Sequence, residues 1–229
     1  MNVLVSVATG GFSNNLYRCA PSIKKWWPGS VMVWTDELPP GSPTHAEQPY
    51  AFKAFAAKWA FDNGYKTVTW IDSAIHVASS PDRYIQHLNE EGYFFQNNGF
   101  NCAQTCSDKA LDYYGISRDA AENIVEVVGG CWGLHVRNSN FVDELCRNAK
   151  IGLFSGSREK DPSDSTDPRF LFCRHDQSLM SLMVYNRGWT PKTSWDETSS
   201  DAFFNYGPTA NPNKCFVLDN SYGQTNKSF

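Results

Sequence analysis

The first half of the chain alternates between short apolar runs and longer amphipathic stretches. Residues 3–8, 31–34 and 67–71 are nearly continuous in apolar side chains, which is typical of strands buried on both faces of a parallel sheet. Residues 16–25 and 50–63 have helical spacing, and in the second stretch Phe52, Phe55, Ala56, Trp59 and Ala60 follow an i, i+3, i+4, i+7, i+8 pattern. This alternation predicts an α/β fold with a central, mixed but mostly parallel sheet flanked by helices.

The second half has a more mixed pattern. A helix is expected after Ser80 and Pro81, with Ser80 as its cap, and further helices are expected at 109–114, 119–126, 141–149 and 176–186. Short strands are expected at 93–96, 132–136 and 215–218, and the polar residues 155–169 read as a loop or lid. We interpret residues 1–229 as one domain, with 1–100 and 101–229 as two functional halves.

Composition narrows the class of protein. The net charge is −4 and basic residues are scattered, so no nucleic-acid partner is expected. No stretch is long enough for a membrane segment, and the first apolar run is too short for a signal peptide, so a cytoplasmic location is expected. The seven cysteines lack zinc-finger spacing and favour reduced thiols, with one disulfide left open.

Asp72 is the first candidate site residue, because it directly follows the strand at 67–71. Ligands of open α/β sheets bind beyond the carboxyl ends of the strands. Thr9 and Gly10 follow the first strand and Asp36 follows the second, so parallel strands would place all of them at one edge. Lys53, on the preceding helix, could approach an anion there. The simpler alternative for Asp72 is a carboxylate that caps the next turn.

His175 and Asp176 form the second candidate, at the start of a predicted helix. Asp176 is either an N-cap or a catalytic carboxylate, and His175 a metal ligand or proton donor. A third candidate is the segment that contains Gly129, Gly130 and Trp132, where glycines allow the backbone to approach a ligand closely. The alternative for that segment is a tight corner. It is not a P-loop, and no dinucleotide-binding fingerprint occurs in the chain.

Taken in order, these segments resemble a GT-A glycosyltransferase. Residues 3–11 resemble its first strand and turn, 53–73 its helix and strand ending in the D-x-D motif, 129–136 its glycine-containing strand, and 175–177 its Asp-Gln helix start. Small glycosyltransferases of large DNA viruses are the closest likeness. The resemblance implies transfer of a sugar from a nucleotide-diphospho-sugar, with UDP as the expected nucleotide, to a glycan or glycoprotein acceptor.

The resemblance also implies roles for individual residues. The donor would contact Ala8, Thr9, Gly10, Asp36, Lys53, Asp72, Ser73 and Ala74, and the substrate sugar or acceptor would contact Gly129, Gly130 and Trp132. Asp176 would deprotonate an acceptor hydroxyl, with Asp164 or Asp167 as reserves, if transfer inverts the configuration. Mn²⁺ or Mg²⁺ would be held by Asp72 and by His175 or Asp176, together with the diphosphate.

One position departs from the family pattern. Ala74 stands where D-x-D has its second carboxylate, so a weak metal site is expected.

Two alternative functions stay open. The first is a nucleotidyltransferase that makes sugar nucleotides, although residues 9–13 lack the basic residue expected of its first turn. The second is a carbohydrate-binding domain without catalysis, which the loss of that carboxylate favours.

Overall fold

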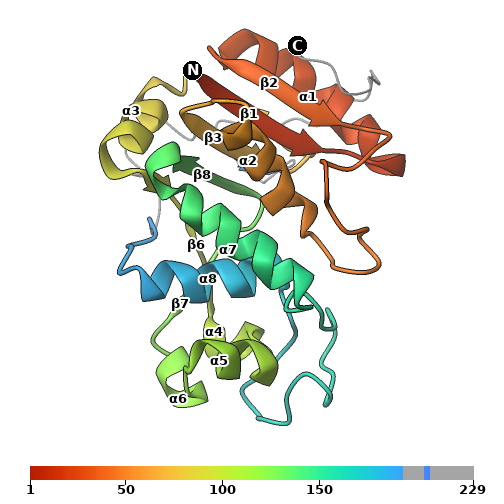
Figure 1. Ribbon diagram of the computed structural model, residues 1–229, viewed down its shortest axis with the longest axis vertical. Helices are drawn as coiled ribbons and strands as arrows, with labels where there is room; N and C mark the ends of the chain where they lie inside the picture. The colour runs from red at the N-terminus through yellow and green to blue at the C-terminus, as the bar shows by residue number, and fades with distance from the viewer. Residues whose placement is uncertain (193–203, 207–229) are drawn as a thin grey trace.

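The computed structural model of the 229-residue chain describes residues 1–192 and 204–206. Its central sheet has five strands in the order β2-β1-β3-β8-β5 (Figure 1). These strands are β1 (Asn2–Val7), β2 (Ser30–Trp34), β3 (Thr67–Ile71), β5 (Tyr93–Phe94) and β8 (Cys131–His135). The first three are parallel, and β8 runs antiparallel to β3 and to β5. The predicted mixed, mostly parallel sheet is therefore confirmed.

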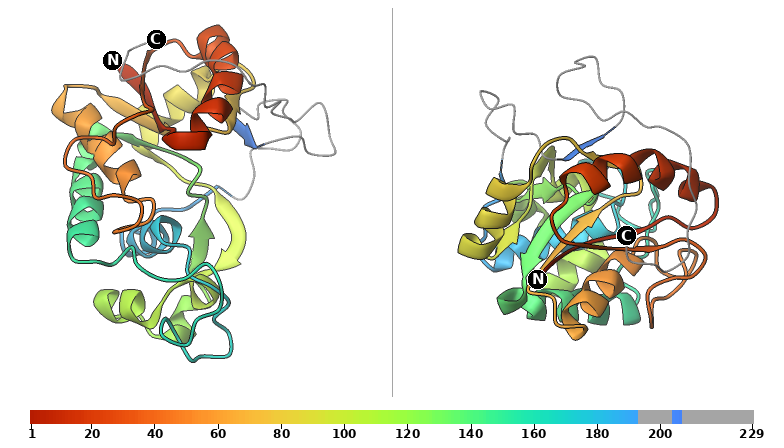
Figure 2. Two further views of the ribbon diagram at one scale, coloured as in Figure 1. Left: turned by 90° about the vertical axis from the view of Figure 1, so that its right-hand side faces the viewer. Right: turned by 90° about the horizontal axis from the view of Figure 1, so that it is seen from above.

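Helices cover both faces of this sheet (Figures 1 and 2). Side chains alternate across a strand, so Val3, Val5 and Val7 enter one core while Leu4 enters the other. The first core is shared with α2 (Phe52–Asp62), α7 (Ser139–Lys150) and α8 (Asp176–Asn186). The second is shared with α1 (Ser13–Trp26) and α3 (Asp82–Glu91). Burial on both faces explains why these strands read as continuous apolar runs.

A smaller region lies on the far side of α8 from the central sheet (Figure 1). It contains an antiparallel pair of strands, β6 (Asn97–Asn101) and β7 (Val125–Val127), with the short helices α4 (Cys102–Thr105), α5 (Asp108–Tyr114) and α6 (Arg118–Ala121). The helix predicted at 119–126 exists as α6 but is wrong in its second half, because α6 ends at Ala121 and β7 begins at Val125. Val125 and Val127 are β-branched and pair with β6, a contact that local spacing does not reveal.

The other sequence-based elements agree with the structure apart from their ends. The helix predicted at 176–186 is confirmed at both ends, whereas the strand at 93–96 is shorter. The N-cap of α3 is Pro81 and not Ser80, whose hydroxyl donates a 2.6 Å hydrogen bond to Asp82. The sequence missed β4 (Ile75–Val77), which pairs with β9 (Phe204–Tyr206), and the single turns Gly10–Phe12 and Val136–Asn138. The strand predicted at 215–218 lies outside the described residues.

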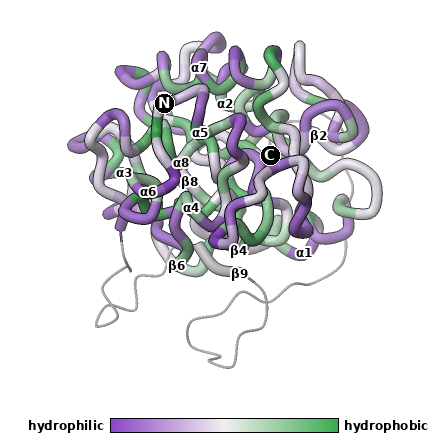
Figure 3. The backbone as a smooth tube through the Cα atoms, turned by 90° about the horizontal axis from the view of Figure 1, so that it is seen from below, coloured by the Kyte–Doolittle hydropathy of each residue, from purple (hydrophilic) through white to green (hydrophobic). Residues whose placement is uncertain are grey.

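Apolar segments run through the interior and polar segments lie mostly at the periphery (Figure 3). Within the part of the chain that the structure describes, no helix has both the length and the apolar character needed to cross a membrane. The six cysteines in that part are all buried free thiols, as the sequence favoured. Cys215 lies outside it.

Candidate functional site

A cavity of about 660 Å³ opens at the carboxyl ends of β1 and β3. Its lining combines a glycine turn, four aromatic rings, one histidine, one carboxylate and one arginine. The residues are Val7, Thr9, Gly10, Gly11, Phe12, Asn15, His45, Tyr50, Phe52, Trp70, Asp72, Ser73, Ala74 and Arg158. A second cavity, of about 530 Å³, lies against α2 and α7 and contains none of the predicted site residues. The first cavity is the candidate site.

The turn after β1 leaves its backbone open to this cavity. Gly10 has φ of 59°, a left-handed conformation that glycine adopts without strain. A Cβ atom built on Gly10 or Gly11 would meet no atom within 4 Å. Phe12 follows with 65% of its surface exposed, and α1 begins at the next residue. The turn therefore offers free backbone and an exposed aromatic ring to a ligand.

Asp72 lies at the end of β3, as the sequence predicted, and lines the cavity. Its backbone N–H donates to the carbonyl of Gly130 at 2.7 Å, which fixes the turn after the strand. Its Oδ1 accepts a 3.0 Å hydrogen bond from the indole nitrogen of Trp70 and lies 3.2 Å from Nζ of Lys53. The side chain of Asp72 keeps 36% of its surface exposed. The carboxylate is thus held in position at the edge of the cavity.

Lys53 is buried behind Asp72 and does not line the cavity. Its Nζ lies 2.8 Å from Oδ2 of Asp176 and 3.2 Å from Oδ1 of Asp72, and it donates to the carbonyl of Gly129 at 2.8 Å. These three acceptors match the three N–H groups of an ammonium. Burial would lower the pKa of Lys53, but attraction to Asp176 and Asp72 outweighs it and raises that pKa. Lys53 therefore stays charged and joins α2, β3 and α8.

Two residues beside Lys53 have left-handed backbone conformations. Tyr50 has φ of 63° and His175 has φ of 52°, and in the described residues no other non-glycine residue has positive φ. Their rings lie 5.6 Å apart. Nδ1 of His175 lies 2.9 Å from the carbonyl oxygen of Phe154, so Nδ1 carries the proton of a neutral imidazole. Such conformations gather at functional sites, which supports this location.

Arg158 and His45 are cavity residues that the sequence reasoning missed. The guanidinium carbon of Arg158 lies 5.0 Å from the ring centre of Tyr50, and the ring of His45 meets Tyr50 edge-on at 4.6 Å. Burial, followed by the charge of Arg158, lowers the pKa of His45, so its imidazole is neutral at pH 7. The available signals were His45, in the loop before the helix predicted at 50–63, and Arg158, within the predicted lid at 155–169.

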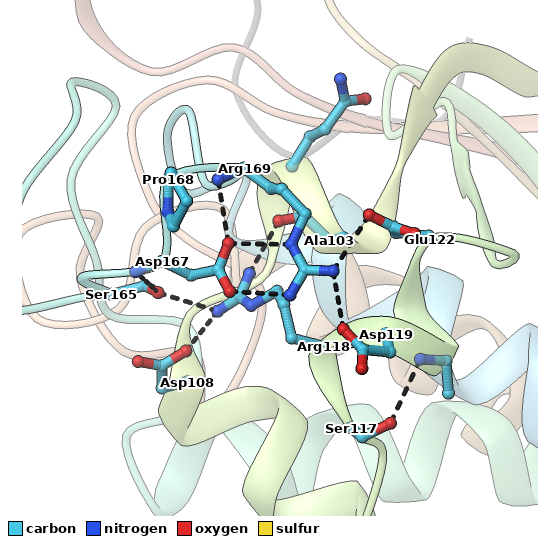
Figure 4. Close-up of polar contacts among 12 residues, drawn as sticks. Ala103, Asp108, Ser117, Arg118, Asp119, Glu122, Ser165, Asp167, Pro168 and Arg169 are labelled. Carbon is cyan, nitrogen blue, oxygen red and sulfur yellow. Dashed lines mark hydrogen bonds and ion pairs between the residues drawn. The ribbon is translucent and has the colours of Figure 1, made fainter.

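The loop that carries Arg158 is tied to α6 by an ion pair of Arg169 and a hydrogen bond of Arg118, which also pairs with Asp108 of α5 (Figure 4). The guanidinium of Arg169 lies 2.8 Å from Asp167, 2.7 Å from Asp119 and 3.0 Å from Glu122. Arg118 pairs with Asp108 and donates to Ser165 at 3.1 Å and to the carbonyls of Ala103 and Cys106 at 2.8 Å. These contacts therefore fix the second half of the loop that the sequence predicted as a loop or lid.

Several predicted site residues lie away from the cavity. Ala8 is buried, Asp36 is exposed outside the lining, and Trp132 is fully buried and stacked on Trp70. Gly129 does allow a close approach, but to α8: a Cβ there would lie 2.7 Å from Oδ2 of Asp176.

Asp176 is the first residue of α8 and not its N-cap, which is His175. The side chain of Asp176 is only 6% exposed and pairs with Lys53. Of the reserve bases, Asp164 accepts a 2.6 Å hydrogen bond from the backbone of Ser157, and Asp167 pairs with Arg169. None of these three carboxylates lines the cavity, whose lining does include Asp72, His45 and Tyr50 as side chains able to transfer a proton.

In the described residues, no group of three or more His, Cys, Asp or Glu side chains is arranged to hold a metal ion. Of the predicted ligands only Asp72 lines the cavity, so metal binding stays a prediction. No protein-family model and no curated protein matches this chain.

Proposed function

We propose that this protein is a glycosyltransferase that uses a nucleotide-diphospho-sugar as donor. The observation that supports the proposal most is the cavity at the carboxyl end of parallel strands, where an open glycine turn, aromatic walls, a carboxylate and an arginine converge. This combination suits the nucleoside, the diphosphate and the sugar of such a donor. The volume of the cavity, about 660 Å³, is within the range of pockets for small-molecule ligands.

Each part of the lining has a counterpart in the donor. The rings of Phe12, Tyr50 and Phe52 offer apolar faces for a nucleobase and a sugar ring. The free backbone at Gly10 and Gly11 accommodates the ribose or the diphosphate without a side chain in the way. Asp72 would accept hydrogen bonds from sugar hydroxyls, in a geometry held by Trp70 and Lys53.

The chemistry is the exchange of one glycosidic bond for another. The bond between the anomeric carbon and the diphosphate oxygen breaks, its electron pair leaves with the diphosphate, and an acceptor hydroxyl oxygen bonds to that carbon. The hydroxyl proton passes to a base or to the departing diphosphate. Positive charge beside the diphosphate favours its departure, because negative charge develops there in the transition state.

A non-catalytic glycan-binding domain is the second candidate. The concentration of aromatic rings in the cavity favours it, because such rings also pack against sugar faces. The two functions differ in their ligand, since a glycan-binding domain would take an oligosaccharide without a nucleotide.

Calorimetric titration of UDP, with GDP and dTDP alongside, tests the proposal. We expect one nucleoside diphosphate to bind and Gly11→Leu to abolish binding, because Gly11 lines the cavity and leucine adds bulk where the backbone is now open. Gly11→Ala should fold and bind, since its Cβ meets no atom. A Gly11→Leu protein that folds and still binds the nucleotide would place the donor elsewhere.

Transfer itself is tested with a panel of sugar derivatives of the nucleotide that binds. Release of nucleoside diphosphate in the presence of mixed glycan acceptors is the expected result. Binding of oligosaccharides by a protein that ignores all three nucleotides would overturn the transferase proposal in favour of the glycan-binding domain.

A further inference from the structure

We propose that Arg158, and not a divalent cation, supplies the positive charge that holds the donor's diphosphate. The inference rests on the proposed function and concerns the same cavity. It follows from where the two cationic side chains of the site lie: Lys53 between the carboxylates and Arg158 at the cavity.

The predicted metal ligands do not form a site for a resident ion. Oδ1 of Asp72 is already shared between the indole of Trp70 and the ammonium of Lys53. His175 is buried outside the cavity lining, with Nδ1 turned to a backbone carbonyl. Ala74 supplies no oxygen ligand. A divalent cation would therefore have a single protein carboxylate, and that one is partly neutralised.

Lys53 occupies the place where a cation would find two carboxylates. Its Nζ lies 2.8 Å from Asp176 and 3.2 Å from Asp72, which is the ion-pair distance on both sides. A second cation between these groups would meet strong repulsion from the ammonium, since water does not screen charges well at a buried position. Lys53 is also buried outside the cavity lining, at ion-pair distance from both carboxylates, so it does not reach the donor.

Arg158, unlike Lys53, is open to the cavity. Its side chain is exposed, lines the cavity, and lies over the ring of Tyr50. The ion pairs found in residues 1–192 do not include Arg158, so its charge is available to an anion. The planar guanidinium can donate two parallel hydrogen bonds to phosphate oxygens. The ion pairs of Arg169 hold the same loop at its other end.

The test is titration of UDP, or of whichever nucleoside diphosphate binds, in EDTA and in Mn²⁺. The proteins are the unmodified chain, Arg158→Met and Lys160→Met. Lys160 is a matched control, because it is a cation two residues away that is exposed and outside the cavity lining. We expect equal affinity in EDTA and Mn²⁺, and a loss of about 10- to 100-fold in Arg158→Met in both buffers, since hydrogen bonds to charged groups are lost. Lys160→Met should bind as the unmodified chain does.

Two results would overturn the inference. One is binding that needs Mn²⁺, and the other is unchanged affinity in Arg158→Met. Absence of binding to every nucleotide in both buffers is a different result, which overturns the proposed function and this inference with it. A direct probe is the electron paramagnetic resonance spectrum of Mn²⁺ added to the protein alone, where a free-ion spectrum is expected and a protein-bound signal would contradict the inference.

Discussion

At the scale of single residues, the structure assigns Lys53 a different position from the one that its helical pattern predicted. The helical pattern left Lys53 outside the apolar stripe of its helix, as a residue that could reach an anion. The structure buries it between Asp72, which follows β3, and Asp176, the first residue of α8. Its function within the proposed site is to position the Asp72 carboxylate and to neutralise a buried one.

Replacing Lys53 with Met should destabilise the fold strongly. The change leaves the Asp176 carboxylate buried without its partner, and breaking a buried ion pair in this way costs about 3–5 kcal/mol. Urea unfolding measures the loss. The double variant Lys53→Met/Asp176→Asn should recover part of it, because no unpaired charge remains.

Lys58→Met is the matched control on the same helix. Lys58 pairs with Asp62 and Asp143 at the surface, with 42% of its side chain exposed. Pairs of that kind contribute about 1 kcal/mol or less. Equal losses for the Lys53 and Lys58 variants would mean that the buried junction contributes no more than a surface pair.

At the scale of elements, the loop at 155–169 contacts both the cavity at the central sheet and the smaller region that contains α6. Arg158 lies at the cavity while Arg169 lies against α6, as Figure 4 shows for the second of these contacts. Such a polar segment is ordinarily interpreted as a free loop, but its Arg169 pairs with Asp119 and Glu122, which are distant in sequence.

Arg169→Ala should loosen this loop. The change removes contacts to Asp167, Asp119 and Glu122 at once, and local opening then exposes the backbone to proteases. We expect several-fold faster cleavage after Glu159 by a glutamyl endopeptidase. Arg147→Ala is the control, because Arg147 is an exposed arginine of α7 that forms none of the described ion pairs. An unchanged cleavage rate in Arg169→Ala would show that other contacts hold the loop.

At the scale of the whole molecule, burial of His175 links stability to pH. Burial is the main cause that lowers the pKa of His175 below its ordinary value of 6.5. The unfolded chain therefore binds a proton at a higher pH than the folded chain does. The free energy of unfolding should fall as the pH decreases through 6.5, by at most about 1.4 kcal/mol per pH unit for this one group.

The measurement is urea unfolding at about pH 7 and about pH 5 in the unmodified chain and in His175→Asn. Asparagine is among the non-glycine residues found most often at positive φ, and it does not titrate. We expect a smaller decrease between the two pH values in the variant. The same decrease in both proteins would assign the acid sensitivity to other groups.

The sequence by itself determined the strands and helices whose burial leaves a hydrophobic pattern along the chain. The apolar runs of β1, β2 and β3 and the periodic helices α2, α7 and α8 were all predictable, because burial on two faces or on one face leaves a direct record in the order of residues. The same pattern placed Thr9, Gly10 and Asp72 at one edge of the sheet, where they line the cavity. It did not reveal β7, because pairing with β6 overrode the local helical pattern.

Only the tertiary structure decided which charges meet. Lys53, Asp72, Gly129 and Asp176 come from four separate segments, and their contacts depend on how α2, β3 and α8 pack. In the same packing, Asp176 and Trp132 are buried away from the cavity that they were predicted to line, whereas Arg158 lines it. Electrostatic contacts act through space and leave no periodic pattern along the chain, so the cation that we propose for this site could be inferred only from the folded structure.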